Sequence, residues 1–458
     1  MEEYFRLRND LIRSDSTSLG LSQPSELEAL ASSKLNLLRE EFSSRFSIDD
    51  MLDFWGIKDR VISTRLFQTL KKMPKGAVLH LHYGGTLPAT EVLPLLKHDP
   101  QIYIKIEGGQ ITTYGSYQEN ATQLSEFLSN PDNEQLFVTA IEMNREKSFG
   151  LPSQRWTHFE GIFTATLLYT YTEKRIYEKY LEIFFTKFYE ENIQRIEYRH
   201  MPFAMKDLGR TIFIDEEMDF IKGLCDKFSS AHPDFSSGTI LSTHKAFSKE
   251  RIISEGEEIY RLHLKYPRFV LGFDILGEEE TYKEDEEIYA AIHVIRQKAK
   301  ESGNDFPMYI HAGEVVSKPA PIIYDAFALE TKRLAHGISL IKHPHLMEIA
   351  KEKKITIEAC PISNMLLGYV RDPRIHPALA YLFQGLPVTI SSDDPGLFGY
   401  CGVTHDWVWI YVLWGIDLMH LKKLVEYSID GCTEPEEVRR AWEPKWQEFI
   451  QYLANLEI

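Results

Sequence analysis

The sequence predicts an α/β fold in which eight parallel strands alternate with helices and close into a barrel. From residue 77 onward, short apolar runs alternate with longer amphipathic segments, as expected for repeated strand–helix units. The run Phe269-Val270-Leu271-Gly272-Phe273 suits a strand that is buried on both faces, as in a parallel barrel. Eight such strands are the number that a (β/α)8, or TIM, barrel requires. They are expected at Ala77–His82, Arg195–Met201, Thr239–Thr243, Phe269–Gly277, Met308–Glu314, Arg333–Gly337, Ile355–Pro361 and Pro387–Ser392.

Two helical regions accompany the predicted barrel. Residues 1–70 are expected to form an N-terminal helical extension, because apolar residues recur near helical spacing and Ser and Asp offer caps. The connection over about 83–194 is much longer than a usual strand–helix connection, so we expect a long helical insertion after the first strand, with a helix over Trp156–Thr170. No Pro/Gly/Ser-rich linker separates it, so 71–458 are predicted to be one barrel domain. The apolar residues of the extension are Leu27, Leu30, Leu35, Leu38 and Phe42.

The composition excludes several classes of protein. A hydrophobic fraction of 43% and a charged fraction of 26% are ordinary for a globular chain and exclude wholesale disorder. A formal net charge of −17 argues against nucleic acid as a partner, because such binding depends on neutralising phosphates. The cysteines are widely spaced, which indicates a reducing compartment without a disulfide framework or a structural zinc site. They are Cys225, Cys360, Cys401 and Cys432.

The N-terminus and the apolar runs bear on location. The first residues, Met1-Glu2-Glu3-Tyr4, are acidic and no apolar segment follows them, so we expect no classical signal peptide. The stretch Trp407–Met419 is far shorter than the roughly 20 residues of a membrane-spanning helix. A cytoplasmic or intracellular location without a membrane partner is therefore expected, and non-classical export stays open.

Ionisable residues gather at the ends of four predicted strands, where barrel enzymes build their active sites. The first strand ends His80-Leu81-His82, and side chains two apart on a strand share a face, so both imidazoles can hold one metal ion. The fifth strand ends His311-Ala312-Gly313-Glu314 and the sixth Ala335-His336-Gly337. The eighth continues into Ser391-Ser392-Asp393-Asp394-Pro395.

Each of these segments also has an ordinary structural explanation. The first two histidines could be one packed and one solvated side chain, and His336 could be a hydrogen-bonded core residue. Asp393-Asp394-Pro395 could be a turn that caps the next helix. Four strand ends of one barrel would then all carry such groups by coincidence. The combined pattern therefore favours a catalytic site.

In their order and strand context, these segments resemble the adenosine deaminase family, and more narrowly its adenosine-deaminase growth-factor branch. The matched segments span residues 73 to about 400. The N-terminal 70 residues contribute little to the resemblance. Beyond the strand ends, the resemblance extends to Met73-Pro74-Lys75-Gly76-Ala77, Phe273-Asp274-Ile275-Leu276-Gly277, Cys360-Pro361-Ile362-Ser363-Asn364, Leu367-Gly368-Tyr369-Val370, His376-Pro377 and Ser392–Tyr400.

The resemblance implies one zinc ion, held by His80, His82, His311 and Asp393, with an open position for water. It further implies that zinc-bound hydroxide attacks C6 of a 6-aminopurine and that ammonia leaves, which is hydrolysis of a C–N bond. The predicted strand Phe269–Gly277 contains no lysine that could bridge two metals, which favours a single ion. The cytidine-deaminase pattern, H-x-E followed by P-C-x-x-C, is absent from the sequence.

The resemblance also assigns catalytic roles. Glu314 would protonate purine N1, which requires a pKa raised by a dry pocket. His336 would orient or deprotonate the zinc-bound water and stabilise charge on the attacking oxygen. Asp394 would contact N7 and help to order the water. The backbone N–H of Gly277 would contact N3, where a residue that permits close approach is favoured.

The sequence departs from this family directly after the second histidine. Adenosine deaminases carry an aspartate there for the ribose 5′-hydroxyl, whereas this chain has Tyr83-Gly84-Gly85. One explanation is drift, with Trp156 or Glu160 holding the ribose instead. The other is that loss of the carboxylate removes repulsion against a 5′-phosphate, while glycine exposes backbone N–H donors. We therefore expect AMP to be slightly favoured over adenosine, with Tyr83, Gly84 and Trp156 at the substrate.

The sequence leaves the substrate and the assembly open. The basic residues considered for a phosphate are Lys75, Arg155, His158 and Lys318. The alternatives to AMP deamination are an adenosine-specific deaminase and a catalytically weak adenosine-binding or signalling module of the same fold. The expected partner is a small purine nucleoside or nucleotide, and a homodimer is suggested only by analogy with growth-factor enzymes.

Overall fold

Eight parallel strands form the centre of the computed structural model, which describes residues 1–17, 21, 23–108, 110–202, 205–279, 286–316 and 321–457. The strands pair in two groups of four, in the order β1-β5-β8-β9 and β10-β11-β12-β13. Each strand lies where the sequence predicts one, so the eight-stranded expectation is confirmed. Their bounds are β1 Ala77–Val78, β5 Arg195–His200, β8 Ser236–His244, β9 Val270–Leu276, β10 His311–Ala312, β11 Arg333–His336, β12 Thr356–Ala359 and β13 Val388–Ile390.

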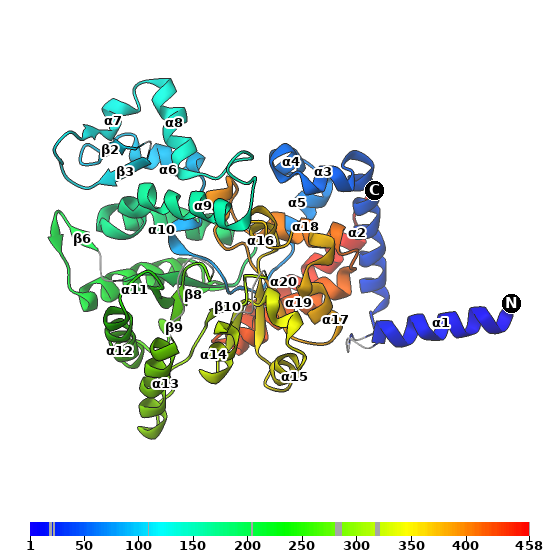
Figure 1. The fold of residues 1–458 in the computed structure, drawn as a ribbon. Helices are drawn as coiled ribbons and strands as arrows, with labels where there is room; N and C mark the ends of the chain where they lie inside the picture. The colour runs from blue at the N-terminus through cyan, green and yellow to red at the C-terminus, as the bar shows by residue number, and fades with distance from the viewer. Residues whose placement is uncertain are drawn as a thin grey trace.

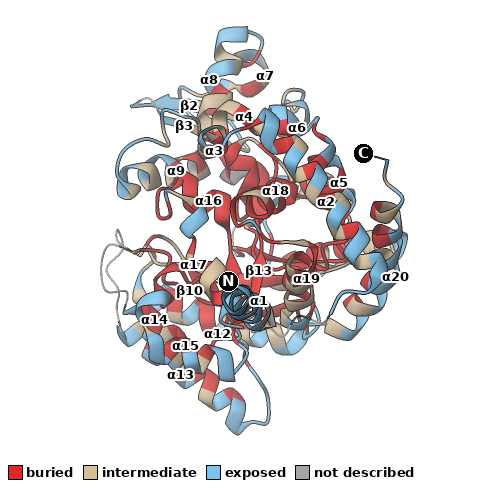
Figure 2. Ribbon diagram, turned by 90° about the vertical axis from the view of Figure 1, so that its right-hand side faces the viewer, coloured by how far each residue is buried: buried red, intermediate tan, exposed pale blue. Residues whose placement is uncertain are grey.

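Two bridges join the groups into a closed (β/α)8 barrel. Phe273 of β9 pairs in parallel with Met308, ahead of β10, and Leu81 after β1 pairs with Asp393 after β13. The backbone N–H of His82 donates to the Asp393 carbonyl at 3.2 Å. Closure leaves the eight-stranded barrel without an edge strand, and the barrel strands are buried (Figure 2).

Helices surround the barrel and follow most of its strands (Figure 1). They are α11 Ile214–Ala231, α12 Lys249–Lys265, α13 Glu286–Glu301, α14 Ile322–Ala328, α15 Pro344–Glu352, α16 Pro361–Leu366, α17 Pro377–Phe383, α18 Thr404–Leu413, α19 Leu418–Gly431 and α20 Pro435–Ala454. A short hairpin, β6 Lys206–Asp207 with β7 Arg210–Thr211, follows β5. In the part of the chain that the structure describes, no helix is long and apolar enough to cross a bilayer.

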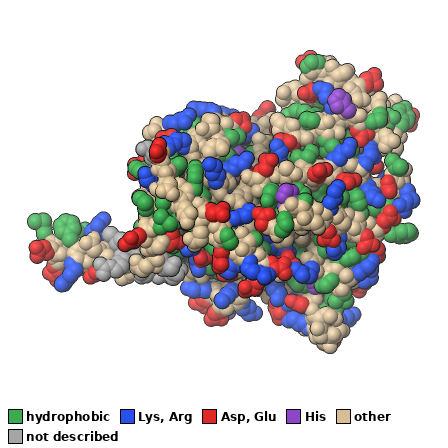
Figure 3. All heavy atoms as spheres, turned by 180° about the vertical axis from the view of Figure 1, so that it is seen from behind, with side chains coloured by type: hydrophobic (Ala, Val, Ile, Leu, Met, Phe, Trp, Pro, Cys, Tyr) green, Lys and Arg blue, Asp and Glu red, His purple; other side chains and the backbone are tan. Residues whose placement is uncertain are grey.

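The N-terminal residues are helical, as expected. Helix α2 packs on α20 and begins with a capping box between Ser25 and Glu28. Of the apolar residues that recur near helical spacing, Leu35, Leu38 and Phe42 are buried there, whereas Leu27 and Leu30 are 41% and 46% exposed. Helix α1 projects away from the body of the molecule, and acidic and basic side chains are interspersed over the rear face (Figures 1 and 3). The five helices are α1 Glu2–Thr17, α2 Glu26–Arg45, α3 Ile48–Leu52, α4 Phe54–Val61 and α5 Arg65–Lys72.

The insertion after β1 carries the expected helices and, in addition, some strands. It contains a small antiparallel sheet in the order β3-β2-β4, in which Tyr103–Glu107 (β2) pairs with Gln110–Tyr114 (β3) and Thr122–Gln123 (β4). Apolar and polar residues alternate along β2 and β3, and Gly108 at φ +60° allows the turn between them. The helices are α6 Ala89–Leu96, α7 Leu124–Phe127, α8 Pro131–Ile141, α9 Pro152–Leu167 and α10 Lys174–Tyr189.

Helix α9 is the part of the insertion that reaches the mouth of the barrel. Its last turn continues as a π-helix over Leu168–Thr172 before α10 begins. The predicted helix over Trp156–Thr170 is therefore present. The widened turn matters because π-helical segments occur frequently at functional sites.

Candidate active site

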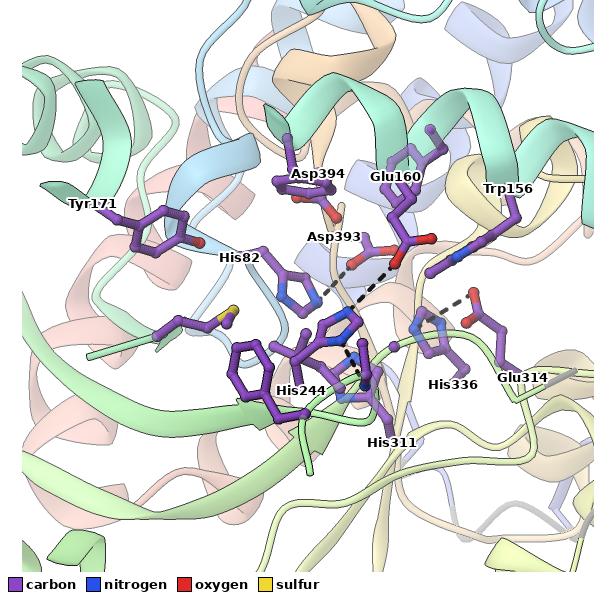
Figure 4. A pocket seen from close by; sticks show the side chains of 17 residues that line it. His82, Trp156, Glu160, Tyr171, His244, His311, Glu314, His336, Asp393 and Asp394 are labelled. Carbon is purple, nitrogen blue, oxygen red and sulfur yellow. Dashed lines mark hydrogen bonds and ion pairs between the residues drawn. The ribbon is translucent and has the colours of Figure 1, made fainter. Parts of the chain in front are cut away.

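A cavity of about 300 Å³ opens at the carboxyl ends of the strands, beneath α9 (Figure 4). Most of the expected site residues line it, from several strand ends and from α9, in the manner of a barrel active site. They are His82, Trp156, Glu160, Gly277, His311, Glu314, His336, Asp393 and Asp394. Residues that the sequence did not single out complete the lining, namely Phe159, Phe163, Tyr171, Met201, His244, Ala246, Phe247 and Leu276.

The four expected metal ligands come together at the floor of this cavity. Ligand atoms of His80, His82 and His311 lie within 4.8 Å of one another. The Nε2 atoms of His80 and His82 each lie 3.2 Å from Oδ1 of Asp393. Three imidazoles and one carboxylate are suitable ligands for an ion such as zinc. Cys360 also lies beside His80 and Asp393, and its burial raises the pKa of its thiol well above the usual range.

Two buried carboxylates hold the histidines of this cluster in place. Nδ1 of His80 lies 2.8 Å from Glu358, and Nδ1 of His311 lies 2.6 Å from Asp274. Such a partner fixes the proton on Nδ1 and leaves the Nε2 lone pair for a metal. The arrangement therefore fits a metal site. The sequence reasoning missed both carboxylates, whose signal was a single acidic residue within an otherwise apolar strand.

Beneath the cluster, the barrel interior contains paired charges. Arg199 contacts Asp274 and Glu358, each at 2.8 Å, and Arg333 joins Glu358 to Glu197. All five side chains are at most 1% exposed. Burial alone would raise the carboxyl pKa values, but the arginines prevail and lower that of Glu197 to about 2 and that of Glu358 further.

At the mouth, two carboxyls behave in the opposite way. Burial raises the pKa of Glu314 well above its usual value, and the neighbouring Asp393 and Glu279 carboxyls add to the effect. Burial and Asp393 likewise raise the pKa of Asp394. Oε1 of Glu314 and Oδ1 of Asp394 are buried and accept no hydrogen bond from the described residues. Both groups therefore favour the protonated form.

His336 lies beside both Glu314 and the metal cluster, with its ring 4.6 Å from that of His80. Its Nε2 is 3.7 Å from Oε1 of Glu314, and its Nδ1 is 3.2 Å from the amide nitrogen of Asn364. Burial lowers the pKa of the imidazole well below the usual value. His336 and Asp393 both have a left-handed backbone, with φ of 62° and 64°. This conformation costs energy in residues other than glycine and is concentrated at functional sites.

The structure corrects the expected substrate contacts after His82. Tyr83 is fully buried outside the cavity, with its ring 4.2 Å from that of Tyr177 and its hydroxyl donating to the Tyr177 carbonyl. The N–H of Gly84 donates to the Tyr171 hydroxyl at 3.2 Å, so Tyr171 lies between this amide and the substrate space. A Cβ at Gly84 would lie 2.7 Å from the Tyr171 ring.

Three of the basic residues considered for a phosphate lie elsewhere or are already paired. Nζ of Lys75 donates to carbonyls of Leu70 and Glu191, ahead of the first strand. Arg155 donates to the Leu366 carbonyl at 2.9 Å, and His158 is exposed. Lys318 lies outside the described residues. No lysine or arginine occurs among the described residues that line the cavity.

Polar groups from outside the expected set face the cavity from two sides. Nε2 of His244, at the end of β8, lies 3.6 Å from the Glu160 carboxylate on α9. Burial lowers the pKa of His244 to about 4. Figure 4 places Tyr171 on the far side of the cluster from Glu314 and Trp156. A strand-end histidine was a signal for His244, whereas nothing in the sequence pointed to Tyr171.

Comparisons with known proteins identify the family of this chain. The family model described as adenosine deaminase matches residues 148–445. "Adenosine deaminase 2" of Dictyostelium discoideum is 30% identical over 92% of this chain and 81% of its own length, and that of Homo sapiens is 28% identical over 93% and 89%.

Solved structures of the same fold are more distant in sequence. The zinc-bound amidohydrolase of Burkhoderia ambifaria has a TM-score of 0.61 at 17% identity, over 85% of this chain and 94% of its own. The Arabidopsis ADAL complex with IMP has a TM-score of 0.59 at 16% identity, over 83% and 99%. The family-model match and the Dictyostelium relative, which is 30% identical over 92% of this chain, show that this chain belongs to the adenosine deaminase family and is a hydrolytic deaminase that acts on a C–N bond.

Proposed function

We propose that the protein deaminates adenosine to inosine, with one zinc ion held by His80, His82, His311 and Asp393. The observation that carries this proposal is a carboxyl with a raised pKa, Glu314, beside that cluster in a cavity without lysine or arginine among its described lining. The donor set and the carboxylates behind it support zinc. A bound zinc ion would lower the pKa of a water towards about 7 and so supply hydroxide.

The chain's own groups would prepare the purine for attack. The raised pKa of Glu314 favours its protonated form, which donates its proton to N1 and makes C6 more electrophilic. The raised pKa of Asp394 lets that carboxyl donate a hydrogen bond to N7, which only accepts. Gly277 lines the cavity at φ +115°, a backbone that brings its N–H close to N3. These contacts together select a 6-aminopurine.

The charge of the cavity favours a nucleoside over a nucleotide, which reverses the preference expected from the sequence. The lining contains Glu160, Glu314, Asp393 and Asp394 and, among described residues, only histidines as basic groups. A phosphate there would lose its hydration without gaining a cationic partner. The space that a carboxylate would leave at Gly84 is filled by the Tyr171 ring. The argument that the missing carboxylate leaves room for a 5′-phosphate at Gly84 therefore no longer holds.

Tyr171 offers the sugar a neutral contact. Its hydroxyl accepts the Gly84 N–H, and no atom of the described residues accepts its own proton. Burial raises the pKa of this phenol, so the proton stays available for donation. We place the sugar at this end because the base must lie beside Glu314, on the other side of the cluster (Figure 4).

The deciding measurement is kcat/KM for adenosine and AMP at one pH, on protein whose zinc content has been determined. We expect about one zinc per chain and a value for adenosine at least tenfold above that for AMP. A higher value for AMP would overturn the nucleoside preference and leave deamination intact. Zinc-loaded protein that releases no ammonia from either compound, or from N6-modified adenosines, would instead favour the binding module.

A further inference from the structure

A chain of buried hydrogen bonds runs from the start of α17 to His336. The backbone N–H of Ala378 donates to Nδ1 of His376 at 3.1 Å. Nε2 of His376 lies 3.1 Å from Oδ1 of Asn364, and the Asn364 amide nitrogen lies 3.2 Å from Nδ1 of His336. All three side chains are at most 2% exposed, so each polar group depends on its protein partner.

The backbone amide fixes the direction of every bond in this chain. A peptide N–H can only donate, so Nδ1 of His376 must accept and its ring carries its proton on Nε2. That Nε2–H needs an acceptor, which is Oδ1 of Asn364. If the Asn364 amide were flipped, its NH2 group would face the Nε2–H of His376, and two donors would be opposed. The NH2 group of Asn364 therefore points at His336.

From this geometry we infer that His376 and Asn364 are positioning residues that hold the proton of neutral His336 on Nε2, so that His336 presents a hydrogen-bond donor to the cavity. Asn364 donates to Nδ1, so Nδ1 is the accepting nitrogen of the His336 ring. Its Nε2–H then faces the space beside Glu314, where the distance to Oε1 is 3.7 Å. The role in the reaction rests on the proposed function, whereas the position of the proton does not.

The resemblance left open whether His336 orients the water or deprotonates it, and this arrangement distinguishes the two roles. With Nε2 already protonated, that nitrogen cannot take a proton from water. Protonation of Nδ1 would set two donors against each other at Asn364. His336 therefore donates a hydrogen bond to the oxygen that adds to C6 and stabilises the negative charge on it. Removal of the water's proton falls to another group.

The proton position can be measured directly in the zinc-loaded protein labelled with 15N-histidine. Long-range 1H–15N spectra distinguish a protonated from an unprotonated ring nitrogen, and loss of one set of signals in His336→Gln assigns the residue. We expect His336 to be protonated on Nε2 and not on Nδ1 at neutral pH. A proton on Nδ1, or on both nitrogens, overturns the inference whether or not the protein turns over adenosine.

Asn364→Asp tests the relay with a side chain of the same shape. A carboxylate still accepts from His376 but no longer donates to His336, so the proton of His336 should move to Nδ1. We expect kcat to fall at least about tenfold with KM and zinc content little changed, because a wrongly placed proton disables an imidazole. An unchanged proton position together with an unchanged kcat overturns the relay.

A second variant separates the relay from folding. His376→Ala removes the group that orients the amide, so His336 should show a mixture of both proton positions and an intermediate kcat. Loss of the cap on α17 lowers stability, which is followed by thermal melting. The matched control is His345→Gln, because His345 is 81% exposed and lies outside the site. Its kcat and the signals of His336 should equal those of the wild type.

Discussion

The mouth of the barrel and the interior beneath it both bury carboxyl groups, but the pKa values of these groups shift in opposite directions. In the interior, the Glu197 and Glu358 carboxylates contact arginines, and their pKa values are lowered. At the mouth, Glu314 and Asp394 face the neighbouring carboxylate of Asp393, and their pKa values are raised. Burial is nearly complete in both regions, so burial alone does not decide which carboxyl keeps its proton.

The difference shows how one barrel supports both a rigid frame and acid catalysis. Arg199 and Arg333 balance the interior carboxylates and, through Glu358, hold His80 in place. At the mouth, no arginine among the described lining residues offsets the Glu314 and Asp394 carboxyls, so these groups favour the protonated form and can donate a proton. The following predictions test each side of this comparison.

The largest effect is expected at the mouth, for Glu314→Gln. The amide has the shape of the protonated carboxyl but cannot transfer a proton, so kcat for adenosine should fall about 100- to 10,000-fold. The measurement is ammonia release at saturating adenosine. Zinc content should match the wild type, and the melting temperature at neutral pH should not fall, because the amide replaces a carboxyl whose pKa is raised on folding. Near-normal turnover would remove the proton-donor role.

Removing a carboxylate from the interior should act on stability instead. Glu358→Gln leaves Arg199 and Arg333 without their shared partner, and breaking such a buried pair lowers the free energy of unfolding by about 3 to 5 kcal/mol. Urea unfolding measures it. The control is Glu437→Gln, whose partner Arg268 is 71% exposed, with an expected change below about 1 kcal/mol. Equal changes in both variants would contradict an interior held by charge balance.

Tyr171→Phe tests the neutral contact at the mouth. It keeps the ring against Gly84 and removes the hydroxyl, so kcat/KM for adenosine should fall roughly tenfold, the value of one hydrogen bond. One of the 2′-, 3′- and 5′-deoxyadenosines should show no further loss, which identifies the sugar hydroxyl concerned. If the loss of kcat/KM instead disappears with 7-deazaadenosine, the Tyr171 hydroxyl contacts N7 of the base and not the sugar.

The smallest effect is a difference in pH dependence between the two regions. Glu314 has a folded pKa above its unfolded value near 4.5, so its contribution is complete below that pH and is lost as pH rises through the folded pKa. Glu197 has the reverse sign, and its contribution is lost as pH falls from about 4.5 to about 2. In metal-free wild-type protein, the free energy of unfolding should therefore fall as pH rises above 4.5. In Glu314→Gln that fall should be smaller, by up to about 1.4 kcal/mol per pH unit. Parallel profiles would contradict the raised pKa.

Short motifs explain what the sequence could predict. His80 and His82 are two apart directly after β1, and His311 and Glu314 lie at and just after β10, so extended-chain periodicity and barrel topology place them together. The partners of these residues depend on distances between strands far apart in the chain. The contact of Glu358 with His80 needs the register of β12 on β13 and the bridge between the segments after β13 and β1, which no local pattern contains.

The insertion limited the prediction in a different way. Tyr171 reaches the cavity because α9 crosses the mouth and ends in a π-helical turn. Periodicity over Trp156–Thr170 predicts the helix but not its path or its widened turn. The role of Gly84 could therefore be judged only as a missing carboxylate, whereas its missing Cβ is what admits the aromatic ring.

The bond that closes the barrel also has a consequence for the order of synthesis. Leu81 and Asp393 form the closing bridge, and the ligands beside it, His80 and Asp393, are 313 residues apart. A nascent chain that has not yet released β13 from the ribosome has neither the last pairing nor the carboxylate ligand. Tight metal uptake should therefore begin only when the last strand joins the first, and metal binding can report completion of the fold.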